Sequence, residues 1–230
     1  MLSLEAQRPR PAPQAYTHAV VMGDLVSSED AASVVGLHGV FNSAIDAANR
    51  RASSAMASPL TITLGDEFQG LSASLRAGLD VLRDVQAHLL AEGVACRFVL
   101  GVARLETPIN SARAWNMMGP GLAASRERLA DKRDPNAYRF HLPGQPAVEI
   151  LMEAVGAGLS EIEQDWTARQ REVVLASAAE SAAELAGRLN ISLPTLYKIR
   201  RAGRFELYGR QWRALETMAA ALDETYGLTP

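Results

Sequence analysis

The first 142 residues alternate between short apolar runs and segments with apolar residues at helical spacing. The short runs predict strands at residues 17–23, 59–64, 67–72, 94–106 and 137–142. The segments between them predict helices at about 28–52, with Ser28 as the cap, 74–92 and 120–132. The order β-α-β-β-α-β, followed by one more helix and strand, is that of a ferredoxin-like sheet with an added α-β unit.

From about residue 146 onward the pattern predicts helices and no further strand. Thr167 and Gln170 form a capping box, Ser181 and Ser192 each precede a helix, and Asn190 suits the tight turn between those two helices because Asn tolerates the left-handed conformation. This pattern resembles the helix-turn-helix of many bacterial transcription regulators. Its small apolar core is predicted to consist of Leu185, Ala186, Leu189, Ile191, Leu196 and Ile199.

The change of pattern divides the chain into an α+β domain and an all-α domain. The predicted segments are a disordered tail at 1–15, an α/β domain at 16–144, a helical linker at 145–166 and a helix-turn-helix domain at 167–230. A last helix at about 209–226 has an apolar stripe at alternating spacings of three and four residues. We expect this stripe to pack on its own domain or to build a homodimer.

Composition narrows the class of protein. The 230 residues carry a net charge of −3 and an ordinary apolar fraction, which is typical of a globular protein. Cys96 is the single cysteine, which excludes a disulfide framework and a cysteine-rich zinc site within the chain, and we expect it to be a buried strand residue. Because no long apolar run or signal-peptide core is present, we expect a cytoplasmic protein with no membrane partner.

Acidic residues occur where two of the predicted strands meet their turns. Asp24 follows Gly23 at the end of the first strand, and Asp66 and Glu67 follow Gly65 at the hairpin. In the predicted strand order these positions are neighbours, so their carboxylates can converge on Mg²⁺, a hard cation that takes oxygen ligands. Adjacent residues of one strand face opposite sides, which favours Asp66 over Glu67. A Gly-Asp turn without a ligand is the alternative.

The segments VVMGDLVSS (20–28) and TLGDEFQGL (63–71) together resemble those of the SatD family. They are similar, more distantly, to class III nucleotidyl cyclases and to the palm domains of diguanylate cyclases. The resemblance covers roughly residues 17–142. It implies a palm- or cyclase-like fold in which Asp24 and Asp66 hold a metal ion and a nucleoside triphosphate.

The chain departs from the cyclase pattern at several positions. Leu122 stands where cyclases tend to have an Asn four residues before an Arg, here Arg126, and Leu64 replaces the first Gly of the diguanylate-cyclase motif. We recognise no base-reading Lys/Asp pair and assign no catalytic residue. Nucleotide binding can survive these changes, because Ser27 and Ser28 would bind phosphate at a helix N-terminus, with Arg126 as a further phosphate ligand.

The surface of the predicted helix-turn-helix is cationic. Residues 188–213 contain seven Lys or Arg and one acid, a net charge of +6, whereas the whole chain is acidic. The second helix of such a unit enters the major groove of DNA, where its early residues face bases and flanking cations meet phosphates. The candidate DNA-binding residues are Thr195, Tyr197, Lys198, Arg200, Arg201 and Arg204. A basic face that binds another protein is the alternative.

Three functions agree with these patterns. The first is a DNA-binding transcription regulator whose cyclase-like domain binds Mg²⁺ or a nucleotide, such as a nucleoside triphosphate or a cyclic nucleotide, as a sensor. The second is an active Mg²⁺-dependent nucleotidyl cyclase or nucleotidyltransferase targeted by its helix-turn-helix, so the sequence leaves enzymatic activity open. The third is a scaffold that binds proteins. A homodimer would suit a palindromic DNA site.

Overall fold

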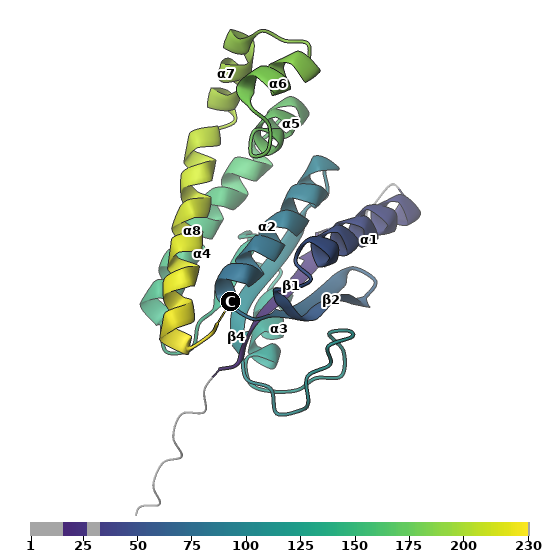
Figure 1. Ribbon diagram of the computed structural model, residues 1–230, viewed down its shortest axis with the longest axis vertical. Coiled ribbons are helices and arrows are strands. Elements are labelled where there is room, and N and C mark those ends of the chain that lie inside the picture. The colour runs from purple at the N-terminus through teal and green to yellow at the C-terminus, as the bar shows by residue number, and fades with distance from the viewer. Residues whose placement is uncertain (1–15, 27–32, 230) are drawn as a thin grey trace, which may run out of the picture.

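The computed structural model describes residues 16–26 and 33–229, which contain a five-stranded sheet (Figure 1). The strands are β1 (His18–Leu25), β2 (Met56–Leu64), β3 (Glu67–Ser72), β4 (Cys96–Ala103) and β5 (Tyr138–His141). Their spatial order is β2-β3-β1-β4-β5, in which β4 and β5 are parallel and all other neighbours are antiparallel. The predicted β-α-β-β-α-β order with an added helix and strand is confirmed.

Eight helices accompany the sheet in the described residues. They are α1 (Val34–Arg51), α2 (Leu75–Ala91), α3 (Leu122–Ala130), α4 (Pro146–Gln164), α5 (Ala168–Ala176), α6 (Ala182–Arg188), α7 (Leu193–Ala202) and α8 (Phe205–Tyr226). Helices α1, α2, α4 and α8 contribute to the core on one face of the sheet, and α3 covers the other face. The fold is therefore a mixed α/β structure in which the sheet is covered on both sides.

The boundaries of the elements differ from the predicted ones by a few residues. Strand β2 begins three residues before its predicted start, because Met56 and Ser58 also pair with β3. The described part of α1 begins at Val34, where the Ser33 hydroxyl accepts a hydrogen bond from the Gly36 N–H at 3.1 Å. The predicted cap Ser28 and the predicted tail at 1–15 lie outside the described residues.

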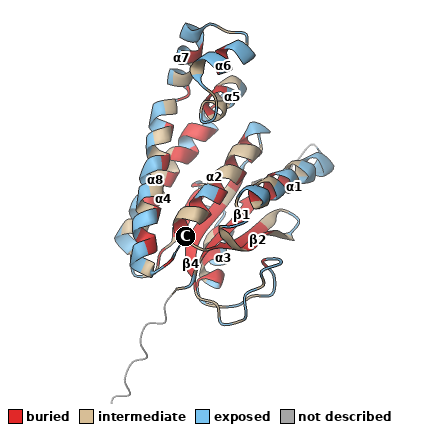
Figure 2. Ribbon diagram, viewed as in Figure 1, coloured by how far each residue is buried: buried red, intermediate tan, exposed pale blue. Residues whose placement is uncertain are grey.

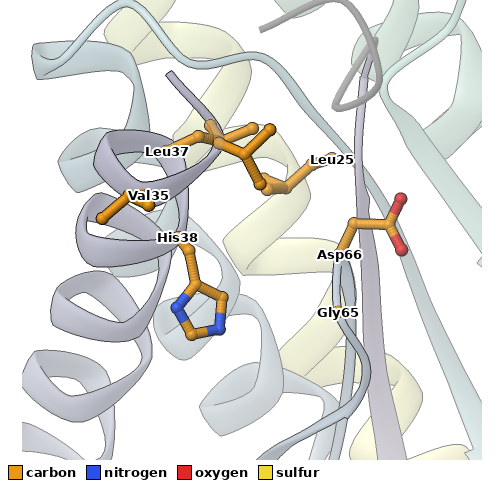
Figure 3. A pocket seen from close by; sticks show the side chains of 7 residues that line it. Leu25, Val35, Leu37, His38, Gly65 and Asp66 are labelled. Carbon is orange, nitrogen blue, oxygen red and sulfur yellow. The ribbon is translucent and has the colours of Figure 1, made fainter.

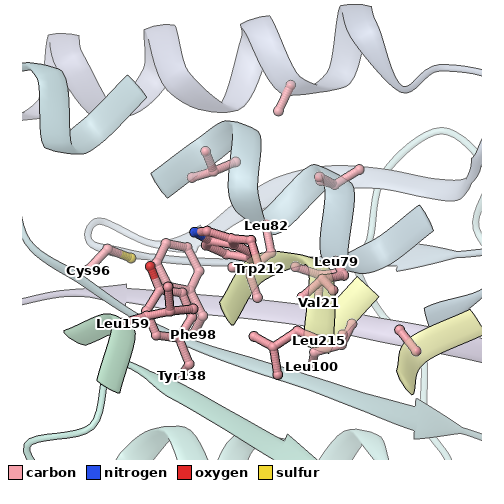
Figure 4. Close-up of a cluster of buried hydrophobic side chains, with 14 of the residues drawn as sticks. Val21, Leu79, Leu82, Cys96, Phe98, Leu100, Tyr138, Leu159, Trp212 and Leu215 are labelled. Carbon is pink, nitrogen blue, oxygen red and sulfur yellow. The ribbon is translucent and has the colours of Figure 1, made fainter. Parts of the chain in front are cut away.

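The main core lies between the sheet and the helices α1, α2, α4 and α8. Figure 2 shows that buried residues are concentrated on the strands and on the helix faces turned toward them. Within this core Trp212 of α8 packs edge-on against Tyr138 of β5, with 5.5 Å between the ring centroids (Figure 4). Cys96 is buried in the same core, as predicted.

Helix α8 packs against the sheet and its helices as well as against the other C-terminal helices. Its apolar stripe, Trp212, Leu215, Ala219 and Leu222, is buried in the main core. Figure 1 shows α8 lying alongside α4 and α2. At its far end, Asp223 accepts hydrogen bonds from the backbone N–H groups of Leu75 (2.6 Å) and Arg76 (3.0 Å), the first two residues of α2. The division into two domains stays a prediction, but this helix joins its core to that of the sheet.

Helices α5, α6 and α7 form a small unit at one end of the molecule (Figure 1). Thr167 and Ser181 are the predicted N-caps, and each is part of a capping box with the residue three positions on. Asn190 has a φ of 50°, which confirms the predicted left-handed turn before α7. A separate apolar cluster of Val173, Leu185, Ala186 and Leu196 lies between these helices, with Leu189, Ile191 and Ile199 at its margin.

No helix in the described parts of the chain combines the length and the apolar character that a membrane crossing requires.

Candidate functional site

Three charged residues form a row across one edge of the sheet. Asp24 of β1 is paired with Glu67 of β3 on one side and with Arg97 of β4 on the other. Directly paired residues of antiparallel strands project to the same face of a sheet. Since Val20 and Met22 of β1 pack under α3, this alternation places Asp24 on the face that α3 covers.

Asp24 is buried and makes an ion pair within this row. The Arg97 guanidinium donates to the Asp24 carboxylate at 3.3 Å, and the two side chains are 13% and 6% exposed. Burial raises the pKa of Asp24, Arg97 opposes this shift, and the negative charges of Asp66 and Glu67 add to it. The ionised form of Asp24 is therefore stabilised by positive charge in its surroundings, whether from the Arg97 guanidinium or from a metal ion.

Asp66 lies at the hairpin turn between β2 and β3. Its carbonyl oxygen accepts a hydrogen bond from the Leu25 N–H at 3.0 Å, which ties the hairpin tip to the end of β1. In Figure 3 the Asp66 carboxylate points away from Leu37 of α1. The structure thus brings Asp24, Asp66 and Glu67 to one edge of the sheet, with Glu67 as the acid directly opposite Asp24.

The residues at this edge fit a hard cation in part. The described residues contain no group of three or more His, Cys, Asp or Glu side chains arranged to hold a metal ion. Mg²⁺ is commonly held by one or two carboxylates and completes its shell with water and phosphate oxygens, so Asp24 and a neighbouring acid would suffice. Magnesium at Asp24, Asp66 and Glu67 stays a prediction.

A hollow of about 490 Å³ lies beside the hairpin tip (Figure 3). It is lined by the end of β1, the start of α1 and the hairpin turn, through Leu25, Val34, Val35, Leu37, His38, Gly65 and Asp66. Most of these side chains are apolar, so the hollow suits an apolar or aromatic ring better than a phosphate. Ser27 and Ser28, which were predicted to bind phosphate at this end of the sheet, lie outside the described residues.

Arg126 of α3 lies on the same face as the acidic row. Its Nη2 donates to Gln69 Oε1 at 2.8 Å, and Gln69 Nε2 donates to the carbonyl of Ala114 at 2.6 Å. Gln69 is two residues from Glu67 in β3, which places both on one face. Arg126 is exposed and also holds Gln69 in position, so its role as a phosphate ligand stays a prediction.

The predicted DNA-binding residues, five in α7 and Arg204 just after it, divide into two groups. Thr195, Tyr197, Lys198 and Arg201 are exposed, while Leu196 of the same helix is fully buried. Within the described residues the side chains of Lys198 and Arg201 form no ion pair. These four residues therefore lie on a polar surface of α7 that is open to solvent.

Arg200 and Arg204 are engaged in contacts within the protein. Arg200 Nε donates to Ser177 Oγ at 2.7 Å, and the guanidinium lies 5.1 Å from the centre of the Phe205 ring. Arg204 connects α7 to α8 in a left-handed conformation and donates to Asp165 at 2.9 Å. Both residues stabilise the junction of α7 and α8, and their contacts with DNA stay a prediction.

Helix α4 contains a buried acid that was not predicted from the sequence. Glu163 is 6% exposed, and its carboxylate accepts hydrogen bonds from the hydroxyls of Tyr138 (2.6 Å) and Tyr208 (2.8 Å) and from Gln86 Nε2 (2.8 Å). Burial raises the pKa of Glu163 to about 7, although the three hydrogen bonds oppose the shift. A signal was present, because Glu163 follows Leu159 at helical spacing on the apolar face of α4.

Comparisons with known proteins agree with part of the sequence analysis. The chain matches the SatD family over residues 18–216. One of the solved structures that it matches is described as the structure of a bacterial light-regulated adenylyl cyclase, with 14% sequence identity and a TM-score of 0.40. That match covers 56% of this chain and 77% of the other. A search of curated proteins finds no match.

Proposed function

The chain belongs to the SatD family, and from this premise we propose that it is a DNA-binding regulator whose cyclase-like region binds Mg²⁺ or a nucleotide as a sensor. The observation that carries the DNA-binding part is the exposed surface of α7. A helix that inserts into the major groove needs a polar face free of internal contacts and an apolar face held by the rest of its unit. Helix α7 has both, since Leu196 is fully buried and Lys198 and Arg201 are exposed without a side-chain hydrogen bond or ion pair in the described residues.

The charge around α7 supports binding to a polyanion. Residues 188–213 carry a net charge of +6, and two acids outside this segment pair with it, Glu180 with Arg188 and Asp165 with Arg204, which leaves a charge of 6 − 2 = +4. Lys198 and Arg201 form no ion pair within the described chain. These two cations can neutralise DNA phosphates without first breaking a salt bridge.

DNA binding is tested by fluorescence anisotropy with labelled duplex DNA over a range of salt concentrations. The double variant Lys198→Ala/Arg201→Ala should bind more weakly, and its log–log salt slope should be smaller by about 1.8, because each lost phosphate contact removes about 0.9. Arg50→Ala/Arg113→Ala, which removes two exposed cations outside the C-terminal helices, is the charge-matched control and should bind as the native chain does. Equal affinity and slope for all three proteins would contradict the proposal and favour a protein partner.

The sensor part is supported by the edge of the sheet. The row of Glu67, Asp24 and Arg97 holds a buried carboxylate beside two further acids, which is suited to a cation that carries phosphate oxygens. The hollow beside Asp66 has apolar walls and enough volume for a nucleobase. A nucleotide with its ring in the hollow and its phosphates on a metal ion at the acids would use both features.

The sensor part is tested by isothermal titration with ATP and GTP, each with and without Mg²⁺. Binding should require Mg²⁺ and should be lost in Asp66→Ala, while Asp46→Ala, an exposed acid of α1, should bind normally. Turnover of the nucleotide that is lost in Asp66→Ala would favour the enzyme over the sensor. If neither nucleotide binds the native chain, the acids at the hairpin are turn residues and the sensor part is wrong.

A further inference from the structure

A second cleft, of about 510 Å³, lies on the other side of the Asp24 row. It is lined by the turn between α2 and β4, the loop between α3 and β5, the last turn of α4 and the start of α5. Arg97 belongs both to the charged row and to this cleft. The cleft is thus placed between the sheet and the unit formed by α5, α6 and α7.

Positive charge dominates this cleft. Its three cations are Arg97, Lys132 and Arg171. Arg97 is paired with Asp24, but the side chains of Lys132 and Arg171 form no hydrogen bond or ion pair with any other described residue. The guanidinium of Arg171 lies close to Gly93. A Cβ atom at Gly93 would be 3.4 Å from Arg171 Nη2.

The two acids of the cleft are already engaged. Asp134 accepts a hydrogen bond from the Asn136 N–H at 2.9 Å and lies 3.8 Å from the Arg139 guanidinium. Glu163 accepts bonds from two tyrosines and Gln86, and its raised pKa of about 7 lowers its negative charge near neutral pH. Neither acid neutralises Lys132 or Arg171, so the cleft presents two cations to whatever enters it.

The rest of the wall is largely apolar. Leu90, Val94, Pro135 and the ring of Trp166 line the cleft together with two alanines. Small-molecule sites typically combine apolar walls with a few polar groups that fix orientation. An inorganic ion would leave these walls in contact with water, whereas an organic body would cover them.

We infer that this cleft binds a small organic anion, with a phosphate or carboxylate held by Lys132 and Arg171 and an apolar or aromatic body against Leu90, Val94 and Trp166. The residues that hold the ligand differ from those proposed to bind magnesium and a nucleotide, although the two sites adjoin at Arg97, which lines the cleft and pairs with Asp24. The cleft site does not depend on DNA binding. The ligand that fits this cleft has a charged head group joined to a ring or a short apolar chain.

The cleft is connected to α7 through Trp166. The indole N–H of Trp166 donates to the carbonyl oxygen of Gly203, the residue that ends α7, at 2.8 Å. The same ring packs against Tyr208 of α8, with 4.9 Å between centroids. A ligand against Trp166 therefore contacts a residue that holds the end of α7, which makes the indole N–H a reporter of binding.

The test is a titration of the full chain with phenyl phosphate and with benzoate, followed by the ¹⁵N–¹H signals of its three indole N–H groups. Phenol and inorganic phosphate are titrated separately as the ring and the anion alone. The Trp166 signal, assigned with Trp166→Phe, should shift saturably with at least one ring-bearing anion and less with either fragment. Lys132→Ala and Arg171→Ala should each weaken binding about tenfold, the value of one charge-assisted hydrogen bond.

Two control variants test whether binding depends on Lys132 and Arg171 in particular. Arg133→Ala removes an exposed cation next to Lys132 and should leave the affinity unchanged. Asp66→Ala should also leave it unchanged, so loss of nucleotide binding in that variant and loss of anion binding in Arg171→Ala are separate results. The inference is overturned if neither ring-bearing anion shifts the Trp166 signal at millimolar concentration. It is also overturned if inorganic phosphate binds as tightly as phenyl phosphate, or if Arg133→Ala weakens binding as much as Lys132→Ala.

Discussion

Glu163 couples the stability of the core to pH. Its carboxyl is buried among Tyr138, Tyr208 and Gln86, and its pKa is raised from 4.5 to about 7. The folded state therefore binds this proton more tightly than the unfolded state. The resulting contribution to the free energy of unfolding is fully present below pH 4.5 and is lost as pH rises toward 7, by about 3 kcal/mol in total.

Glu163→Gln should remove this pH dependence. The amide is neutral at every pH, its oxygen can still accept from both tyrosines, and its NH₂ can meet Gln86 Oε1, which has no hydrogen-bond partner in the described structure. Urea unfolding from pH 5 to pH 8 should show a flatter profile for this variant and greater stability than the native chain at pH 8. The control is Glu161→Gln, an exposed acid of the same helix, which should keep the native profile.

Arg97→Ala should destabilise the protein most at neutral and alkaline pH. The substitution leaves the buried carboxylate of Asp24 without its partner, which costs about 3 kcal/mol for a broken buried pair. The pKa of Asp24 should rise further in this variant. The loss of stability should therefore shrink as pH falls and Asp24 takes up a proton. Thermal unfolding at pH 4.5 and pH 8 measures this, with Arg104→Ala, whose partner Glu106 is exposed, as the control. An equal loss at both pH values would show that Asp24 is not the cause.

The positions of the acids in the charged row could be predicted from the sequence only in part. The spacing of Gly and Asp was enough to place Asp24 and the hairpin acids at one sheet edge. It favoured Asp66 over Glu67, because neighbours in a strand face opposite sides. Which acid stands opposite Asp24 depends on the pairing register of β1 and β3, and that register is set by packing across the sheet.

At the level of elements, the close approach of α4 to β5 depends on Gly156. A Cβ at this position would lie 2.7 Å from the Tyr138 Cβ and 3.0 Å from its carbonyl oxygen. Gly156→Ala should therefore push the helix from the strand and lower the free energy of unfolding by about 1–3 kcal/mol. The matched control is Gly187→Ala in α6, where nothing lies within 4 Å and the better helix propensity of Ala should stabilise by about 0.5–1 kcal/mol. Chemical denaturation of both variants checks the prediction, which fails if the two changes have the same sign.

Elements with a local signal were predicted well from the sequence. Caps such as Thr167, Ser181 and Ser192 accept hydrogen bonds from backbone N–H groups within their own helix, so their effect is visible in a few neighbouring residues. The partner of an amphipathic helix is not encoded in this way. The stripe of Trp212 and Leu215 in α8 indicated a buried face but not that α2 and α4 would cover it.

At the level of the whole molecule, α8 makes the sheet and the C-terminal helices depend on one another. It buries Trp212, Leu215, Ala219 and Leu222 in the main core. Its Asp223 accepts hydrogen bonds from the N–H groups of Leu75 and Arg76, while the adjacent Ser74 accepts one from Ala77, so two of the first N–H groups of α2 depend on a residue far away in the chain. The predicted α/β domain at 16–144 lacks all of these C-terminal residues.

A chain that ends at Arg204 should therefore fail to form a packed core, although it retains every strand. Removal of α8 would expose Tyr138, Leu79 and Leu82, and the near-UV circular dichroism and the dispersion of amide NMR signals should be lost. A smaller change isolates the cap, because Asp223→Ala should cost about 2 kcal/mol from two unsatisfied N–H groups, whereas Glu224→Ala on the exposed side should cost little. If the shortened chain folds cooperatively and Asp223→Ala matches Glu224→Ala, the sheet region is an independent domain, as the sequence alone predicted. If both changes destabilise as expected, α8 is a structural part of the sheet region.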